Sequence, residues 1–274
     1  MNGLALDSTL TLNNGVHIPR FGLGVFRSGR ETRDAVQAAL AAGYRHVDTA
    51  HIYRNEAEVG AALGSGAVAR GDVFVTTKLW NDHHGYDAAL RAFDESLRAL
   101  GLEYVDLYLL HWPVPGMRLE SWRALEAIHR TGKARAIGVS NFTERHLLEL
   151  ADVAQILPAV NQVELHPFLA QPGLVAACHK LGIAVEAYSP LAKGRRLDHP
   201  VLAEVGRAHG KSVAQVMIRW SLQKGFISIP KSANPKRIQE NAAVFDFALS
   251  EAEMRTLDGL DEGLRTAWDP TGVE

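Results

Sequence analysis

The sequence predicts an α/β protein, a single (β/α)8 TIM barrel preceded by an N-terminal β-hairpin. Eight short apolar runs alternate with helical patterns along 274 residues. The runs are too apolar for strands that keep one face in water, so they indicate a parallel sheet covered by helices. Eight repeats within about 250 residues match the usual size of a closed barrel. Because no Pro/Ser-rich linker divides the chain, we expect one domain over 1–274.

The hairpin is expected over about 9–19, as a lid or floor of the barrel. Two alternating runs flank Asn14-Gly15, a dipeptide typical of tight hairpin turns because both positions tolerate positive φ. The eight barrel strands are then expected at 21–25, 45–49, 73–78, 105–111, 134–140, 159–165, 183–189 and 226–230.

Helices are expected between these strands, where apolar residues recur every three or four positions and several segments end at glycine. The longest interval, 190–225, has room for an extra helix. After Ser250 we expect a short helix and then an irregular C-terminal tail, about 259–274, which contains Trp268.

Composition is that of an ordinary globular protein, with 47% hydrophobic and 22% charged residues. The net charge of −2 gives no field to hold nucleic acid or an anionic membrane. No signal-peptide pattern and no membrane-span pattern is visible. Cys178, the only cysteine, cannot form an internal disulfide and is expected to be structural. We therefore expect a cytoplasmic protein.

Four unusual side chains follow neighbouring strands of the predicted barrel: Asp48, Tyr53, Lys78 and His111. Each alone has an ordinary explanation, as a helix cap, a packing residue or a solvated charge. In a barrel, however, the carboxyl ends of the strands meet at one rim, where reactive groups gather. The coincidence of all four at this rim indicates a catalytic site.

These four residues suit the reduction of a carbonyl group. Tyr53 can act as an acid if Lys78 lowers the pKa of its phenol, and Asp48 can hold Lys78 by pairing with it. His111 can orient a carbonyl oxygen. No activated Ser or Cys is visible, and no metal is expected, because the adjacent His83 and His84 point apart. A hydride from a bound cofactor remains as the nucleophile.

A phosphate-binding turn is expected after the last strand. The glycine fingerprint of open-sheet dinucleotide folds is missing, because 22–27 ends in Arg27 and 64–69 follows a helix. Segment 229–241 instead gathers Lys231, Ser232, Lys236 and Arg237. A solvated basic turn is the alternative, but barrels often hold phosphate after strand eight beside a helix start. Cations beside a hydroxyl suit the ribose phosphate that distinguishes NADPH from NADH.

Several motifs occur in a fixed order: DTAHIYRNEAEVG, KLWN, LLHWP, GVSNF, NQVELHP, YSPL and IPKSANPKRIQEN. In this order and spacing they resemble the aldo-keto reductase family, from about residue 10 to 260. The similarity is greatest to the microbial branch that includes 2,5-diketo-D-gluconate reductases and methylglyoxal-type reductases.

The resemblance implies a barrel with an N-terminal hairpin, extended NADPH, and a tetrad of Asp48, Tyr53, Lys78 and His111 with Tyr53 as proton donor. It also implies roles around the cofactor: Ser140, Asn141 and Gln162 at the carboxamide, Tyr188 stacked on the nicotinamide, Ser189 and Leu191 at the pyrophosphate, Lys231, Ser232 and Arg237 at the 2′-phosphate, and Glu240 and Asn241 at the adenine. The alternatives are core packing for Tyr188, and barrel-interior amides bonded to one another for Gln162 and Asn161.

Two departures from the family pattern concern the substrate pocket. Phe26 stands where many relatives carry tryptophan, and with Trp80 and Trp112 it is expected to form an aromatic cup that excludes water. Segment 112–120 and the C-terminal loop are short. We expect an open pocket with broad substrate tolerance.

Three functions are compatible with these patterns. The first is an NADPH-dependent reductase of small-molecule aldehydes and ketones, among them sugar-derived dicarbonyls such as 2,5-diketo-D-gluconate or methylglyoxal. The second is an NADP-binding regulatory barrel with little catalysis, although such a protein needs no proton donor. The third, a hydrolase or lyase, requires a metal cluster or paired carboxylates at the rim, and the sequence indicates neither. The resemblance suggests a monomer.

Overall fold

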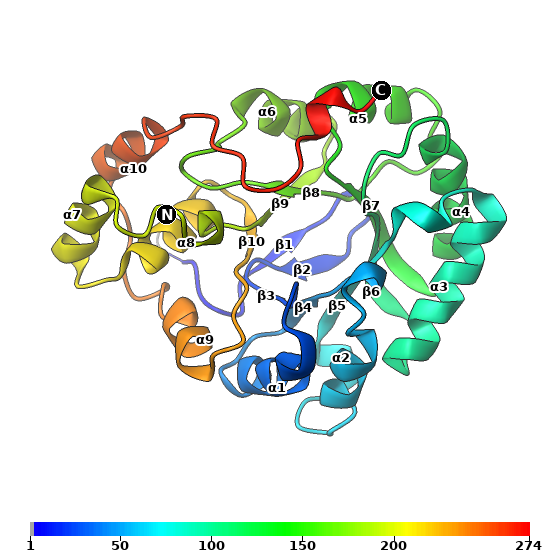
Figure 1. Cartoon of the computed structure of the whole chain (residues 1–274), viewed down its shortest axis with the longest axis horizontal. Helices are drawn as coiled ribbons and strands as arrows, with labels where there is room; N and C mark the ends of the chain where they lie inside the picture. The colour runs from blue at the N-terminus through cyan, green and yellow to red at the C-terminus, as the bar shows by residue number, and fades with distance from the viewer. Residues whose placement is uncertain (1–2) are drawn as a thin grey trace.

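The computed structural model describes residues 3–274 and shows eight parallel strands ringed by helices (Figure 1). The barrel strands are β3 (Leu23–Gly24), β4 (His46–Asp48), β5 (Phe74–Leu79), β6 (Val105–Leu110), β7 (Ala134–Ser140), β8 (Val160–Glu164), β9 (Ala184–Tyr188) and β10 (Ile227–Ile229). Each strand pairs in parallel with the next one along the chain. The predicted fold class is confirmed.

Main-chain hydrogen bonds between the first and last strands close the barrel. The Gly22 N–H donates to Ser228 O at 3.0 Å, and the Ser228 N–H donates to Arg20 O at 2.9 Å. Parallel bridges join Phe21 to Ser228 and Gly24 to Lys231. The closed ring leaves no barrel strand with an unpaired edge.

The N-terminal hairpin consists of β1 (Thr9–Thr11) and β2 (His17–Pro19), paired antiparallel. Its turn differs from the expected two-residue form. The Leu12 N–H donates to Val16 O at 2.8 Å, which leaves residues 13–15 as a three-residue loop. Only Gly15, with φ of 84°, takes the left-handed conformation, as a three-residue hairpin loop requires.

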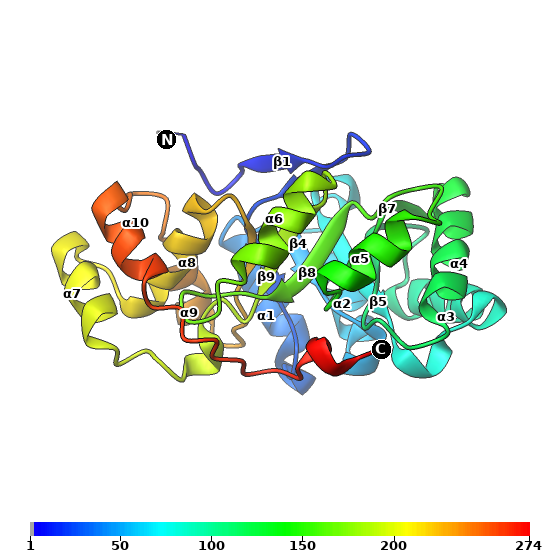
Figure 2. The same cartoon turned by 90° about the horizontal axis from the view of Figure 1, so that it is seen from above.

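The hairpin is the floor of the barrel. The side-chain amides of Asn13 and Asn14 donate to Pro158 O and Arg135 O, which precede β8 and lie at the start of β7. Leu12 and Ile18 join an apolar cluster with interior residues of the barrel. Figure 2 shows β1 on one side of the molecule and the C-terminal segment on the opposite side. The carboxyl ends of the strands are therefore the open face.

Ten α-helices surround the barrel within residues 3–274: α1 (Thr32–Ala41), α2 (Glu56–Leu63), α3 (Tyr86–Leu100), α4 (Arg118–Arg130), α5 (Glu144–Ala151), α6 (Pro172–Lys180), α7 (Pro200–His209), α8 (Val213–Gln223), α9 (Pro235–Ala242) and α10 (Glu251–Asp258). α7 is the extra helix predicted in the longest interval, and α10 is the short helix predicted near the end. α3 buries Ala89, Phe93, Leu97 and Leu100 at helical spacing and ends at Gly101. Within the described residues no helix has both the length and the apolar character needed to cross a bilayer.

Helix α2 packs so closely on α3 that position 60 has no room for a side chain. A methyl group there would lie 2.1 Å from the carbonyl oxygen of Leu100. Gly60→Ala should therefore lower the free energy of unfolding by about 1–3 kcal/mol, because the two helices must separate to admit the methyl. Urea titration followed by circular dichroism measures the loss.

The matched control is Gly173→Ala in α6, where the same methyl would meet no atom within 4 Å. This variant should be neutral or slightly stabilising, since alanine favours helix more than glycine does. Equal losses in both variants would contradict the packing explanation.

Candidate active site

The ends of neighbouring strands deliver the four predicted reactive residues. Asp48 ends β4, Lys78 is the second-last residue of β5, and His111 directly follows β6. Tyr53 lies in the short 3-10 turn η2 (His51–Tyr53) after β4. Four separate sequence positions thus reach the open face of one barrel.

The loop that carries Tyr53 is held by a buried asparagine that the sequence analysis did not identify. Asn55 accepts a hydrogen bond from Thr49 Oγ1 at 2.7 Å and donates to Val25 O and Thr32 Oγ1 at 3.0 Å each. It is 1% exposed. These bonds tie the β4–α2 loop to the segment after β3 and limit the positions that Tyr53 can take.

Lys78 and Asp48 form an ion pair inside the barrel. Lys78 Nζ donates to both carboxylate oxygens of Asp48, at 2.6 and 2.7 Å, and to Thr49 O at 2.9 Å. The lysine side chain is 0% exposed. All three N–H groups of the ammonium are satisfied, which allows a charge to persist without water.

Tyr53 and His111 lie beside this pair. Lys78 Nζ is 5.2 Å from the centre of the Tyr53 ring, and the rings of Tyr53 and His111 meet edge to face with centroids 5.7 Å apart. The structure therefore brings together all four residues of the predicted tetrad.

The expected effect of Lys78 on Tyr53 is not what the structure shows. The pKa of the Tyr53 phenol is raised well above its usual value, first by burial and then by the charges of Asp48 and Glu186. The net shift is thus opposite in direction to the lowering expected from Lys78, because burial and the two neighbouring carboxylates dominate. Tyr53 keeps its proton at neutral pH and can donate it only to a strongly basic oxygen.

His111 is a neutral imidazole. Burial, and then the positive charge of Lys78, hold its pKa well below the usual value. Its Nδ1 is buried without a hydrogen-bond partner among the described residues. A neutral ring can donate one hydrogen bond to a substrate oxygen without adding charge.

A second carboxyl group lies below the tetrad, although no sequence pattern indicated paired carboxylates. Gln162 Nε2 donates to Asp48 Oδ2 and to Glu186 Oε2, both at 2.8 Å. Burial raises the pKa of Asp48 against the attraction of Lys78. Burial, and then the charge of Asp48, raise the pKa of Glu186 to about 8. Asp48 faces the open cavity, whereas Glu186 is 0% exposed beneath it.

A large cavity opens above the tetrad and runs across the face of the barrel. It encloses about 1450 Å³. Its lining includes every residue predicted for the site except Lys78 and Lys236, namely Phe26, Asp48, Tyr53, Trp80, His111, Trp112, Ser140, Asn141, Gln162, Tyr188, Ser189, Leu191, Lys231, Ser232, Arg237, Glu240 and Asn241. Lys78 lies behind Asp48 and Tyr53.

Beside the tetrad, the cavity wall consists of amide and hydroxyl groups that bind one another. Asn141 Nδ2 donates to His111 O at 3.0 Å and to Ser140 Oγ at 3.1 Å. Asn141 Oδ1 accepts from Tyr188 Oη at 2.8 Å. Asn161 bonds to Phe142 O and the buried Cys178. The alternative of a bond between Asn161 and Gln162 is therefore wrong.

The far end of the cavity is the basic start of α9. Asn234 caps this helix by accepting from the Arg237 N–H at 3.2 Å. Lys231 and Arg237 are exposed, and Ser232 is buried beside them. Lys236 points elsewhere, since it does not line the cavity and lies 3.9 Å from Glu240. A helix N-terminus beside two exposed cations favours a bound anion.

Aromatic side chains line the mouth of the cavity near the tetrad. The Phe26 ring lies 5.0 Å from that of Tyr53, and the Trp80 ring lies 5.2 Å from that of His111. Trp112 packs at 5.8 Å against Trp268 from the C-terminal tail. Trp268 is 70% exposed. The tail thus adds an aromatic wall that no local sequence signal placed in the site.

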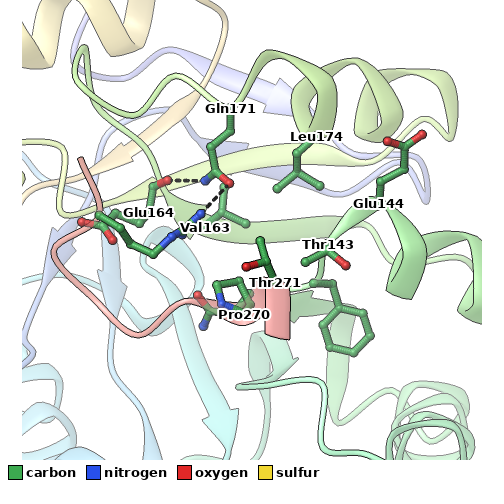
Figure 3. Close-up of a pocket in the computed structure, with 11 residues that line it drawn as sticks. Thr143, Glu144, Val163, Glu164, Gln171, Leu174, Pro270 and Thr271 are labelled. Carbon is green, nitrogen blue, oxygen red and sulfur yellow. Dashed lines mark hydrogen bonds between the residues drawn. The ribbon is translucent and has the colours of Figure 1, made fainter. Parts of the chain in front are cut away.

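A buried carboxylate holds the tail against the barrel. Glu164, at the end of β8, accepts hydrogen bonds from the Thr266 N–H, the Ala267 N–H and Thr266 Oγ1. These donors and His166 hold its pKa at about 2, against the effect of burial. Figure 3 shows Glu164 and Gln171 with Thr271 of the tail around a small cavity of about 130 Å³. Glu164 therefore helps to place the last wall of the large cavity, together with Lys193 Nζ, which donates to Thr266 O at 2.7 Å.

Comparison with known proteins identifies the family. Residues 21–262 match the model of the Aldo/keto reductase family. An uncharacterized oxidoreductase of Bacillus subtilis, YtbE, is 51% identical over 98% of each chain. Morphine 6-dehydrogenase of Pseudomonas putida is 50% identical over 97% of this chain and 95% of its own. Glyoxal reductase of Bacillus subtilis is 49% identical over 97% of each.

Solved structures share the whole barrel. A mutant of the protein Gox0644, crystallised in complex with NADPH, superposes with a TM-score of 0.93 and is 41% identical in sequence. The match covers 98% of this chain and 99% of that one.

The attachment of the tail can be tested at Glu164. Glu164→Gln should raise hydrogen exchange at the amides of Thr266 and Ala267 by ~10- to 100-fold, because each lost charge-assisted hydrogen bond costs about 1.5–3 kcal/mol. Exchange measured by mass spectrometry or NMR reports the change. Unchanged protection of the two amides would show that the tail is held by other contacts.

Attachment of the tail should depend on pH, because the Glu164 carboxylate can be protonated in acid. Because the pKa of Glu164 is lowered, its carboxylate stabilises the bound tail fully when the pH is above the usual pKa of 4.5. This stabilisation is lost as the pH falls through about 2. The wild-type tail should therefore open in acid, while the tail of the Gln variant should be loose at every pH.

Proposed function

The chain belongs to the aldo/keto reductase family, and on this premise we propose that it is an NADPH-dependent reductase of aldehydes and ketones. The observation that carries the proposal is the cluster of Asp48, Tyr53, Lys78 and His111 at the base of the long cavity. A regulatory barrel that only binds the cofactor does not require a buried ion pair beside a protonated phenol.

The cavity fits a dinucleotide in size and in its donor set. Its length connects the tetrad with the basic start of α9, where Lys231 and Arg237 make no ion pair with a carboxylate within residues 3–274. We assign the 2′-phosphate to Lys231, Ser232 and Arg237, the adenine to Glu240 and Asn241, and the pyrophosphate to Ser189 and Leu191. The relative Gox0644 binds NADPH, which supports this assignment.

The nicotinamide end belongs beside the tetrad. We assign the carboxamide to Ser140, Asn141 and Gln162, and the ring to the face of Tyr188, whose hydroxyl is fixed by Asn141. Bound NADPH would supply a hydride to the carbonyl carbon of the substrate. The chain itself then has to bind the carbonyl oxygen and give it a proton.

Tyr53 is the proposed proton donor. Its raised pKa keeps the proton on the phenol until negative charge develops on the substrate oxygen, which is then the stronger base. His111, a neutral donor, would orient that oxygen. The phenolate left after proton transfer would be stabilised by Lys78, which Asp48 keeps in place.

Small dicarbonyl compounds are the proposed substrates. Glyoxal reductase and morphine 6-dehydrogenase are both about half identical to this chain, so the scaffold supports substrates of very different size. The mouth is open, with Phe26 42% and Trp268 70% exposed. We propose broad tolerance, with methylglyoxal and 2,5-diketo-D-gluconate as candidates and Phe26, Trp80 and Trp112 as the pocket walls.

The role of Tyr53 can be tested by removing only its phenolic oxygen. Tyr53→Phe should lower kcat for methylglyoxal by ~10²- to 10⁴-fold, the usual contribution of a general acid. The fall in NADPH absorbance measures the rate, and fluorescence titration should show unchanged NADPH binding. Tyr104→Phe, on the floor side of β6, is the control and should keep full activity. A Tyr53→Phe enzyme with near-native kcat would refute the assignment.

The phosphate site can be tested through cofactor preference. Lys231→Ala and Arg237→Ala should each raise the Kd for NADPH by ~10- to 100-fold, because each removes a charge-assisted contact worth about 1.5–3 kcal/mol. The Kd for NADH, which lacks the 2′-phosphate, should change little. Lys236→Ala removes a cation from the same turn but outside the cavity, and should leave both constants unchanged. Equal weakening of NADH and NADPH would contradict the proposed phosphate site.

A further inference from the structure

The buried cluster below the cavity contains two carboxyl groups and only one ammonium. Lys78 directs its N–H groups to Asp48 and to Thr49 O, and none to Glu186. Glu186 receives one hydrogen bond, from Gln162, and its Oε1 has no hydrogen-bond partner among the described residues. A carboxylate oxygen without a donor is costly in a dry interior. When Asp48 is ionised, the proton therefore belongs on Glu186.

The other groups around Glu186 do not supply a compensating charge. His46 Nε2 lies 3.5 Å from Glu186 Oε1 and 3.1 Å from Thr76 Oγ1. Burial lowers the pKa of His46 to about 3, so the imidazole is neutral. On the β10 side the residue in register is the apolar Ile227. The charged or titratable groups that act on Glu186 are then Asp48, Lys78 and Tyr53.

We propose that Glu186 is a positioning residue of the reductase, which holds Gln162 against Asp48 and controls through its own charge how readily Tyr53 releases its proton. This inference rests on the proposed carbonyl reduction. With Glu186 protonated, the Asp48 carboxylate and the Lys78 ammonium balance, so a phenolate at Tyr53 meets no net negative charge. With Glu186 ionised, the phenolate would form beside an uncompensated carboxylate, and proton transfer to the substrate becomes harder.

The direction of the pH effect follows from this charge balance. The pKa of Glu186 is raised to about 8, so the residue ionises within the range in which the enzyme can be assayed. Reduction should be fast below that pH and should slow as pH rises through it.

Glu186→Gln removes the negative charge that the side chain can carry and nearly preserves the size and shape of the side chain. Glutamine keeps an oxygen that can accept from Gln162 but cannot ionise. Wild-type kcat for methylglyoxal should fall above pH of about 8, whereas the Gln variant should stay level and exceed the wild type by ~10-fold one pH unit higher. KM should change little. Glu186→Asp, which retains a titrating carboxyl group, should restore a fall at alkaline pH. Superimposable profiles for wild type and Glu186→Gln would overturn the proposal.

Infrared difference spectroscopy tests directly whether the Glu186 carboxyl group is protonated, and it requires no catalytic turnover. Between about pH 6 and about pH 10, the cofactor-free wild type should lose the C=O absorption of a protonated carboxylic acid, and Glu186→Gln should lack this band. A wild type without the band, or a Gln variant that keeps it, would show that Glu186 does not hold the proton. A wild type that fails to oxidise NADPH with any carbonyl compound would refute the proposed function instead, and the infrared result would still decide the state of Glu186.

Discussion

The buried pair of Lys78 and Asp48 is the interaction on which the rest of this site depends. An ammonium inside a barrel is tolerable only when each of its N–H groups finds an acceptor, and two carboxylate oxygens and Thr49 O meet this need. Loss of one partner from a buried pair leaves an uncompensated charge, at a cost of about 3–5 kcal/mol. The pair therefore constrains β4 and β5 to one register, and the positions of Tyr53 and His111 follow from that register.

Two buried glutamates show how strongly the surroundings decide the chemistry of one residue type. Glu164 accepts several N–H and O–H bonds from the tail, and its pKa falls to about 2. Glu186 receives one amide bond beside another carboxyl group, and its pKa rises to about 8. The first is a permanent charge that fixes a wall of the cavity, and the second is a neutral acid below the reaction centre. Both side chains are 0% exposed, so the hydrogen-bond donors of Glu164 and the charge of Asp48 beside Glu186 separate them.

Much of the fold and of the site follows from local sequence patterns. Apolar runs separated by helical periods predict the eight strands, and polar residues at strand ends predict the tetrad, because every parallel strand ends at the same rim. Contacts between distant segments are not predictable in this way. Glu186 lies within an apolar strand pattern, IAVEAYS, and its meeting with Gln162 depends on strand register. Trp268 enters the site because distant residues bind the tail, among them Glu164, about a hundred residues earlier. The raised pKa of Tyr53 depends on its burial and on the charges of Asp48 and Glu186, and no motif places Glu186 near Tyr53.

The bond from Gln162 to Asp48 joins residues 114 positions apart in the chain, and the barrel closes only when Phe21 reaches Ser228. Such distant pairings form slowly, because a long loop must be ordered before they contribute. No half of the chain can assemble the reaction centre, since β4, β5, β6 and β8 all contribute to it. During refolding, recovery of enzymatic activity should thus trail the return of helical structure, because the proposed catalytic centre needs these distant pairings.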